Sequence, residues 1–422
     1  MEQKLRGVNL GGWLVLEKWM APSLFQGTPA DDEYYLAYDL PEAEYQARLL
    51  IHRETFITEA DFLRISAAGF NTVRIPVPYF IFGDRTPFIG CIDYLDKAFA
   101  WAKAYDLKIL IDLHTAPFSQ NGFDNGGLSG VVRWAQMPEE VAFELTVLER
   151  LAQRYADHEA LWGIEVLNEP ITDGEVWHSM NPMDRFPPRD LALAKGSAPI
   201  SLDFLRTFYQ DAYRRMRNYL SDDKVIVFHD GFQLHAWKEF FTQNDFHNVM
   251  LDTHQYVMMA EMAGTEQSLE AYVSFIDGLA QEIATVAQYV EVFVGEWSLF
   301  NSYAVGTDTK GGINPTQEEF SSNRSLTKSE LEEVYQTLWR ASITAWNQGA
   351  GHMYWTYKLS IDTINEPAWY GWDSWDASRA MAKNWIDPRF NLAFLLLLSN
   401  IHQADLRDIF VDRQFFDHFR KA

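Results

Sequence analysis

Cysteine and long hydrophobic runs are almost absent from the sequence. Its single cysteine, Cys91, excludes an intramolecular disulfide and is typical of a reducing compartment. The longest apolar stretch, within residues 391–400, is shorter than the roughly 18 residues that a transmembrane helix needs. The N-terminus lacks a basic segment followed by an apolar one, so it does not resemble a signal peptide. We therefore expect a cytoplasmic protein, or a secreted one if the N-terminus was trimmed.

Positive charge is also scarce. The chain has 35 Lys and Arg against 59 Asp and Glu, which gives a formal net charge of −24. Such a surface repels nucleic-acid phosphates and anionic lipids. We therefore expect a neutral small-molecule substrate and neither a nucleic acid nor a membrane as partner.

The sequence has no repeat, low-complexity tract, flexible linker or glycine-rich phosphate-binding loop. Its recurring feature is the alternation of short β-branched or apolar runs with longer segments of helical period. The short runs predict eight strands: Leu5–Leu10, Thr72–Ile75, Lys108–Leu113, Gly163–Leu167, Val225–His229, Val249–Thr253, Glu291–Gly295 and Gly351–Trp355. The segments between and after them predict helices at residues 54–68, 92–105, 139–156, 201–220, 266–288, 328–347 and 388–402, and a short helix within 232–245.

Eight strand-then-helix units predict an α/β fold, a single-domain (β/α)8 TIM barrel spanning residues 1–422, with extended loops on its C-terminal face. A doubly wound open sheet is the main alternative. The count of eight and the lack of a glycine-rich phosphate loop both disfavour it. In a barrel, the residues just after each strand gather at one rim, where such folds carry their chemistry.

Polar and aromatic side chains follow most of the predicted strands. Any one of them alone is most simply the start of a solvated loop, a salt-bridge partner or a buried histidine. A barrel, however, would bring the set together: Glu17, Arg74, His114, Asn168, Glu169, His254, Tyr256, Glu296 and Trp355. A metal site is an alternative use of these residues. No HExxH motif or closely spaced histidine pair occurs, so we predict neither metal nor cofactor.

Glu169 and Glu296 follow the fourth and seventh predicted strands. Two carboxyl groups that flank one bond are the minimum equipment for glycoside hydrolysis, because one protonates the leaving oxygen while the other attacks or activates water. A separation of about 5–5.5 Å leads to a covalent intermediate and retained stereochemistry, and a wider one leads to inversion. The pair predicts a glycosidase.

Other rim residues suit the same reaction. Arg74 near a glutamate would keep it ionised and lower its pKa, as a nucleophile requires. Tyr256 could donate a hydrogen bond to that carboxylate, and Asn168 could bind the 2-hydroxyl of the sugar. The remaining rim residues could bind hydroxyls or stack on a pyranose ring: His114, His254 and Trp355.

These segments together resemble glycoside hydrolase family 5, most closely its exo-β-1,3-glucanase and β-glucosidase branch. The similarity rests on "RGVNLGGWLVLEKW", "FNTVRIPVPY", "LKILIDLHTAPFSQNGFDN", "IEVLNEP", "LDTHQY", "VGEWS" and "YWTYK", in that order along the chain. The resemblance implies a retaining β-glycosidase with Glu169 as acid/base and Glu296 as nucleophile. It also implies that Glu17 and Asp124 bind the terminal glucose and that Phe123 clamps the next one.

The sequence departs from that branch around the second sugar. Met259 stands where the fungal exo-glucanases carry the second clamping phenylalanine, Phe118 replaces a glycine, and Tyr357 stands at a usual tryptophan. Residues 171–200 and 300–327 resemble additional loops. We expect exo action on short β-glucans or β-glucosides. An endo-β-glucanase and a non-catalytic carbohydrate-binding barrel are the alternatives.

Overall fold

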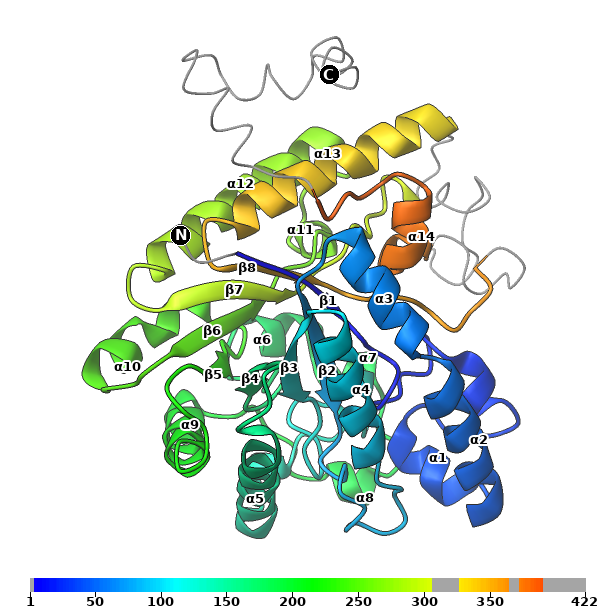
Figure 1. The fold of residues 1–422 in the computed structure, drawn as a ribbon, viewed down its shortest axis with the longest axis vertical. Coiled ribbons are helices and arrows are strands. Elements are labelled where there is room, and N and C mark those ends of the chain that lie inside the picture. The colour runs from blue at the N-terminus through cyan, green and yellow to red at the C-terminus, as the bar shows by residue number, and fades with distance from the viewer. Residues whose placement is uncertain (1–3, 306–325, 364–371, 390–422) are drawn as a thin grey trace.

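The structure is a computed structural model that describes residues 4–305, 326–363 and 372–389. In it, eight parallel strands pair in sequence order and the eighth closes on the first (Figure 1). The strands are β1 (Leu5–Asn9), β2 (Thr72–Val77), β3 (Lys108–Leu113), β4 (Leu161–Glu165), β5 (Val225–His229), β6 (Val249–His254), β7 (Glu291–Glu296) and β8 (Gly351–Tyr354). The predicted barrel is confirmed, and the open sheet is excluded.

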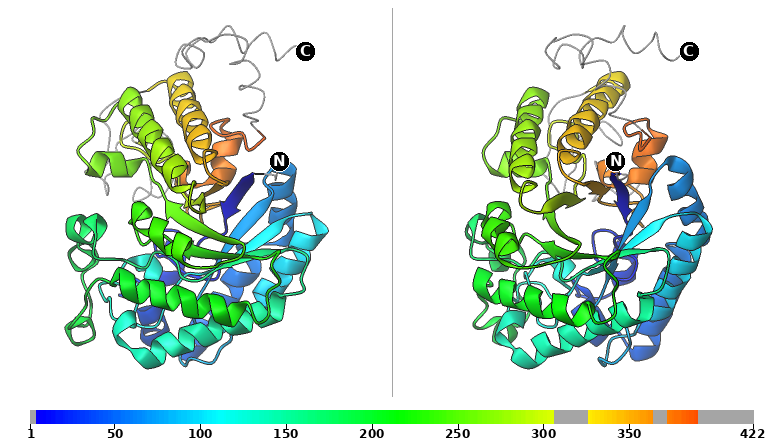
Figure 2. Two further views of the ribbon diagram at one scale, coloured as in Figure 1. Left: turned by 90° about the vertical axis from the view of Figure 1, so that its left-hand side faces the viewer. Right: turned by 60° about the vertical axis from the view of Figure 1, so that its left-hand side comes forward.

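Helices surround the barrel and cover the outer faces of its strands (Figures 1 and 2). In this outer layer α5 packs beside α9, and α12 packs beside α13. The helices that link successive strands are α3 (Glu59–Ala68), α4 (Ile92–Ala104), α5 (Pro138–Tyr155), α9 (Leu202–Met216), α10 (Lys238–Gln243), α12 (Leu269–Val286) and α13 (Lys328–Trp346). Among the described residues, no helix combines the length and hydropathy that crossing a bilayer requires.

The structure corrects several predicted boundaries. The fourth strand covers 161–165 instead of 163–167, and the helix expected at 54–68 begins at residue 59. There the Thr58 side chain and the Asp61 carboxylate form a capping box, which starts a new helix. The helix expected at 388–402 lies outside the described residues from 390 onward.

The loops that cover the barrel contain helices that the sequence did not predict. Before α3 the chain forms α1 (Glu33–Asp39) and α2 (Glu42–Thr55). The additional loop at 171–200 contains three short helices, and a loop helix follows β6. These loop helices are α6 (Glu175–Met180), α7 (Pro182–Arg185), α8 (Leu191–Ala194) and α11 (Met258–Met262), with α14 (Ala377–Ala382) following β8. Of the additional loop at 300–327, residues 306–325 lie outside the described residues.

Helix α9 shows how the outer helices pack against the barrel strands. In α9 the buried residues recur every three or four positions, so they form one stripe that faces the strands. The Ser201 side chain accepts a hydrogen bond from the Phe204 amide and caps the helix start. The stripe meets the edge of Trp134, whose ring lies 4.7 Å from that of Phe208. Its members are Leu205, Phe208, Tyr209, Ala212 and Met216.

Inside the barrel, every second residue of a strand points inward, and these inward side chains form three layers. Leu110 and Asp112 on β3 and His114 directly after it share one face, because successive residues of an extended chain point to opposite sides. The lowest layer is apolar, the next is charged and the top one reaches the rim. β6 repeats the same order with Met250, Asp252 and His254. The apolar layer closes the barrel floor, so the polar groups above it form the bottom of a site.

The apolar floor joins residues from six strands in one buried cluster. Burial of an aliphatic or aromatic side chain of this size contributes about 1.5–3 kcal/mol. The floor therefore offsets part of the cost of burying charged groups above it. Its buried members are Leu5, Leu110, Val225, Val227, Met250, Phe293 and Met353.

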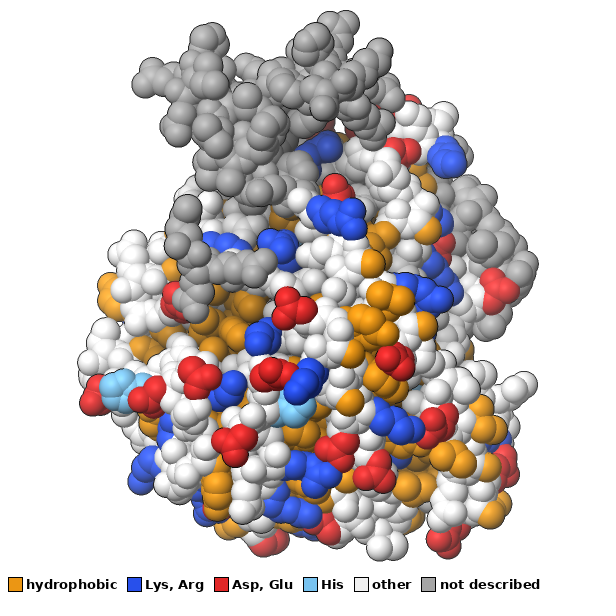
Figure 3. Space-filling model, in the orientation of Figure 1, with side chains coloured by type: hydrophobic (Ala, Val, Ile, Leu, Met, Phe, Trp, Pro, Cys, Tyr) orange, Lys and Arg blue, Asp and Glu red, His pale blue; other side chains and the backbone are white. Residues whose placement is uncertain are grey.

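The surface mixes both signs of charge. On the face drawn in Figure 3, acidic and basic side chains lie interspersed among the described residues. Arg154 donates hydrogen bonds from Nε and Nη2 to Asp96 at 2.9 and 2.5 Å, and Arg85 contacts Glu140 in the same manner at 3.3 and 2.7 Å. The acidic excess is thus partly paired locally.

Gly163 on β4 provides a test of barrel packing. A Cβ placed there would lie 2.5 Å from the Val225 carbonyl oxygen of β5, a backbone atom that cannot move aside. We expect Gly163→Ala to lower the free energy of unfolding by about 1–3 kcal/mol, because the two strands must separate. Urea unfolding measures the change.

Gly278 in α12 is the matched control, since a Cβ there would meet nothing within 4 Å. Gly278→Ala should raise stability by about 0.5–1 kcal/mol, because alanine loses less backbone entropy in a helix. Equal effects of the two substitutions would contradict this account of strand packing.

Candidate active site

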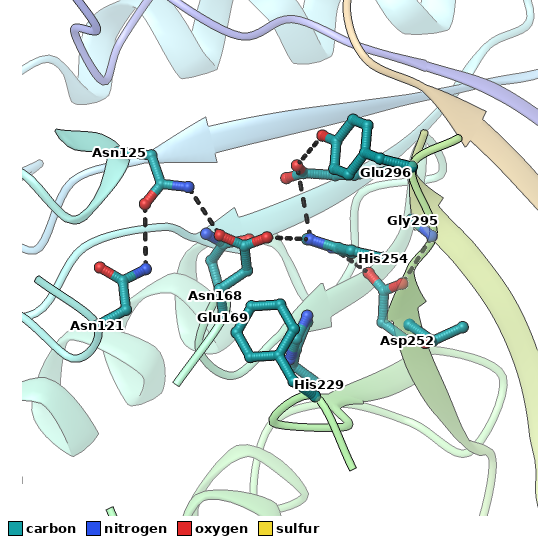
Figure 4. Close-up of polar contacts among 12 residues, drawn as sticks. Asn121, Asn125, Asn168, Glu169, His229, Asp252, His254, Gly295 and Glu296 are labelled. Atoms are coloured by element: carbon teal, nitrogen blue, oxygen red, sulfur yellow. Dashed lines mark hydrogen bonds and ion pairs between the residues drawn. The ribbon is translucent and has the colours of Figure 1, made fainter. Parts of the chain in front are cut away.

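Glu169 and Glu296 lie on either side of His254 at the C-terminal mouth of the barrel (Figure 4). The His254 Nδ1 atom is 2.7 Å from Glu169 Oε1 and 3.5 Å from Glu296 Oε2. These two oxygens are therefore no farther apart than the sum of those distances, about 6.2 Å. Retaining glycosidases place their carboxyl groups about 5–5.5 Å apart and inverting ones about 6.5–9.5 Å apart. For this pair of oxygens the upper bound lies below the inverting range, which agrees with a retaining pair.

Glu296 ends β7 and is held by two donors. Arg74 Nη1 donates to Oε1 at 2.7 Å, and the Tyr256 hydroxyl donates to Oε2 at 2.8 Å. Both contacts agree with the sequence prediction. The predicted fall in pKa does not occur: burial raises the pKa of Glu296 by more than His254 and Arg74 lower it. Enclosure of this carboxyl group outweighs its cationic neighbours.

Glu169 follows β4 in an unusual backbone conformation. Its φ is +43°, in the left-handed region that non-glycine residues rarely adopt. Asn125 Nδ2 donates to Oε2 at 2.7 Å, and His254 holds Oε1. Strained backbone of this kind persists where the surrounding contacts determine it, and it is frequent at active sites. Here those contacts fix the direction of the Glu169 carboxyl group.

The charges of Glu169 and His254 depend on each other. Burial raises the pKa of Glu169, but the hydrogen bond and positive charge of His254, with help from Asn125, bring it below the usual value. Burial lowers the pKa of His254, yet the carboxylates of Glu296 and Asp252 raise it well above the usual value. Both shifts favour a carboxylate at Glu169 and an imidazolium at His254.

Arg74 connects the catalytic mouth to the barrel interior. It is fully buried on β2 and uses its fork of donors on residues from several strands. Its Nε donates to Glu165 Oε2 at 2.8 Å, and its Nη2 donates to Asn168 Oδ1 at 2.8 Å. Further contacts reach Asn9 Oδ1 at 3.0 Å and Asp112 Oδ2 at 3.2 Å. One guanidinium thus orients groups from β1, β3, β4 and β7.

The carboxyl groups below the mouth carry their own pKa shifts. Burial raises the pKa of Glu165 well above the usual value; Arg74 lowers it, while Asp252 and Asp112 raise it further. Asp252 Oδ1 accepts a hydrogen bond from the Gly295 amide at 2.6 Å. A side chain at position 295 would collide with that carboxylate, because a Cβ there would lie 1.9 Å from Asp252 Oδ2.

The predicted sugar-binding residues around the glutamates are also brought together. His114 Nδ1 contacts Asp112 Oδ2 at 2.5 Å, and its Nε2 lies 3.4 Å from Asn168 Nδ2. The Trp355 indole stacks on the His114 ring at 5.7 Å with an interplanar angle of 9°. These groups form a rigid wall of the site.

Glu17 is buried, and Asp124 is half-buried in the same acidic part of the site. Burial raises the pKa of Glu17 well above the usual value, and Asp124, Glu296 and Glu169 raise it further against a hydrogen bond from Trp19. Burial likewise raises the pKa of Asp124 to about 6. Glu17 thus interacts electrostatically with both candidate catalytic glutamates, and Asp124 with Glu169 and Glu17.

Phe123 lies at the edge of the mouth in a small aromatic group. Its ring is 5.8 Å from that of Phe186 and 6.4 Å from that of Phe232. Phe232 was not predicted and occupies a left-handed conformation with φ of +62°. Phe118, which the sequence comparison placed at a family glycine, also has a left-handed φ of +60°. That backbone conformation explains why glycine suits its position.

Metal binding is the alternative chemistry for these groups. Gly231 N–H donates to His229 Nδ1 at 3.0 Å, so the neutral His229 ring carries its proton on Nε2. Two sets of described residues have ligand atoms within 4.8 Å of one another: Glu169, His229 and His254, and Glu165, Asp252 and His254. His254 is common to both, and its Nδ1 atom is engaged by Glu169 at 2.7 Å.

Comparisons with known proteins agree with this geometry. Residues 41–342 match the family model described as cellulase (glycosyl hydrolase family 5). A probable glucan 1,3-beta-glucosidase A from Emericella nidulans is 36% identical over 87% of this chain and 88% of that protein. A glucan 1,3-beta-glucosidase from Kluyveromyces lactis is 34% identical over 86% of this chain and 85% of its own length.

The chain belongs to glycosyl hydrolase family 5. It is therefore a glycoside hydrolase, and the non-catalytic alternative is excluded. Solved structures share the fold. The rutinosidase from Aspergillus niger has a TM-score of 0.68 at 20% identity and covers 91% of this chain and 98% of that one. A GH5-4 broad specificity endoglucanase from an uncultured bacterium has a TM-score of 0.56 at 13% identity, covering 92% and 94%.

Sequence reasoning missed four residues of this family 5 site. Asn125 stands next to Asp124 in a segment already identified, and its amide character was the available signal. Glu165 and Asp252 are charged residues within otherwise apolar strands, a pattern that indicates an inward polar layer. Phe232 carried no signal, because only the folded loop places it beside Phe123.

Arg74→Met tests the buried charge network. Arg74 lowers the pKa of both Glu165 and Glu296, so its loss should raise both folded-state values further. Removal of one partner from a buried ion pair costs about 3–5 kcal/mol. A carboxyl group whose pKa is raised by folding loses stability as the pH rises, so the fall in Tm should be larger at pH 7.5 than at pH 5.

The matched control is Arg214→Met, which removes an exposed arginine that pairs with Asp211 within α9. Its Tm should stay at the wild-type value at both pH values, since exposed pairs contribute little. A pH-independent loss of Tm in Arg74→Met would mean that charge burial is not what Arg74 relieves.

Proposed function

We propose that this enzyme is an exo-acting β-glucosidase of the exo-β-1,3-glucanase type, which releases glucose from the non-reducing end of short β-glucans or β-glucosides with retention. The observation that carries the proposal is the contact of His254 with both Glu169 and Glu296, which sets the carboxyl spacing. The relatives named as glucan 1,3-beta-glucosidases support the substrate class. No cofactor takes part in the mechanism.

In the first step the Glu296 carboxylate attacks the anomeric carbon of the glucose. The bond from that carbon to the glycosidic oxygen breaks, and the oxygen takes a proton from Glu169. A glucosyl ester of Glu296 and a free leaving group result. Arg74 and Tyr256 orient the attacking carboxylate through their hydrogen bonds.

In the second step Glu169 acts as the base. It takes a proton from a water molecule, the resulting oxygen attacks the anomeric carbon, and the ester bond to Glu296 breaks. Glucose leaves with its original configuration, because each displacement inverts the carbon once. The hydrogen bond from Asn125 keeps Glu169 in place through both steps.

The proton for the first step comes through His254. In this proposal His254 carries the proton in the free enzyme. The proton passes along the 2.7 Å hydrogen bond to Glu169 as the leaving oxygen approaches. Entry of a sugar removes the remaining water and makes a charged Glu169 less favourable. His254 therefore supplies the proton that Glu169 donates in the first step, and Glu169 is a carboxylate when it acts as base in the second step.

Glu17 and Asp124 favour exo action over endo action. Buried carboxyl groups recognise the hydroxyls of one sugar by several strong hydrogen bonds. The electrostatic interaction of Glu17 with Glu169 and Glu296, and of Asp124 with Glu169, supports a terminal glucose beside the cleavage point. An endo-acting enzyme would need space for further sugars beyond them.

A laminaripentaose labelled at its reducing end tests the exo proposal. We expect glucose as the first product together with a labelled tetrasaccharide, followed by successively shorter labelled species in chromatography of early time points. Glu296→Gln keeps the shape but removes the nucleophile, and it should lower kcat by at least about a thousandfold.

Labelled disaccharide and trisaccharide formed before glucose would instead identify an endo-glucanase. Full activity in Glu296→Gln would overturn the assignment of the nucleophile, whatever the product pattern.

A further inference from the structure

A cavity of about 600 Å³ opens beside the active site on the side of Glu169 and His254. It lies between α6, the loop after β5, the loop helix α11 and the outer helix α12. His254 and Asp230 form its inner end, and His254 contacts Glu169 directly. The leaving group departs on the side of the acid, and this cavity borders the histidine that contacts the acid.

Ten of the eighteen residues that line the cavity are apolar, and none is a tryptophan or tyrosine. Sugar sites instead combine flat amphipathic aromatic faces with many polar groups. Methionine side chains are flexible and polarizable, and they adapt to irregular apolar groups. The larger apolar side chains of the lining include Met180, Phe232, Met259, Met262, Phe275 and Leu279.

The polar groups near the inner end already have partners within the protein. Asp230 accepts hydrogen bonds from the Phe232 amide at 2.8 Å and from the Thr253 hydroxyl at 2.7 Å. Gln255 donates to the same Thr253 hydroxyl at 2.7 Å. Gln233, farther out, donates to the Thr172 hydroxyl at 2.7 Å. These inner groups are therefore held by the protein itself, and the other polar residues of the lining are Glu175, Ser179, His235 and Glu282.

We propose that this cavity binds the hydrophobic aglycone of a β-glucoside, such as an alkyl chain, while the terminal glucose occupies the site at Glu17 and Asp124. The inference rests on the proposed β-glucosidase activity and adds the chemical class of its leaving group. Met259, at the position of the family's second clamping phenylalanine, replaces a flat sugar-stacking surface by an adaptable apolar one.

The test measures kcat/KM for methyl, butyl and hexyl β-D-glucoside at concentrations below micelle formation. In the wild-type enzyme we expect kcat/KM to rise about tenfold or more from methyl to hexyl, because each added methylene leaves water for the cavity. This comparison needs no variant, so it does not depend on the folding of a mutant.

The double variant Met259→Gln/Met262→Gln keeps side-chain length but makes the lining polar. Its hexyl-to-methyl ratio of kcat/KM should fall to about a third of the wild-type ratio or less, whereas Met259→Leu/Met262→Leu should keep the ratio. Leu50→Gln alters an exposed leucine on α2, far from the cavity lining, and should also keep it.

Two failures are distinguishable. If the wild-type enzyme hydrolyses no β-glucoside or laminari-oligosaccharide, the proposed function itself is wrong. If it hydrolyses methyl and hexyl glucosides with equal kcat/KM, the β-glucosidase proposal stands and the aglycone inference is overturned. An unchanged ratio in the Gln double variant would likewise show that the cavity does not bind the alkyl chain.

Discussion

The contacts of the buried Arg74 guanidinium are the interaction on which the rest of the site depends. A cation inside a barrel is stable only when acceptors surround it, and Arg74 meets them on β1, β3, β4 and β7. The same contacts position Asn168 and Glu296. The charge that stabilises the polar layer of the barrel thus also sets the geometry of the reaction.

A second constraint is the excess of buried acid around that cation. Glu17, Asp124, Glu165 and Glu296 all have raised pKa values, with burial as the largest cause in each case. Glu169 is the exception: its pKa is lowered, because the hydrogen bond and positive charge of His254 outweigh the effect of burial. The two candidate catalytic carboxyl groups share His254 and differ in their other neighbours: Glu169 accepts a hydrogen bond from the Asn125 amide, and Glu296 accepts from Arg74 and Tyr256.

Much of this arrangement follows from the sequence, because alternation of strand and helix patterns predicts a barrel and a barrel brings the strand ends together. The helix α2 was not predicted, since its buried face includes His52 and Arg53 and so lacks a clear apolar stripe. The lowered pKa of Glu169 and the raised pKa of Glu296 were also beyond prediction. Both depend on distances of a few ångströms and on burial, which a sequence pattern does not contain.

The central claim is that Glu296 attacks the sugar and Glu169 transfers the proton. Azide rescue tests both roles through the configuration of the product. With 2,4-dinitrophenyl β-glucoside and azide, Glu296→Ala should give α-glucosyl azide, because azide replaces the nucleophile. Glu169→Ala should give β-glucosyl azide, because azide attacks the ester on Glu296. The opposite pairing of variants and products, or the same anomer from both, would contradict the account.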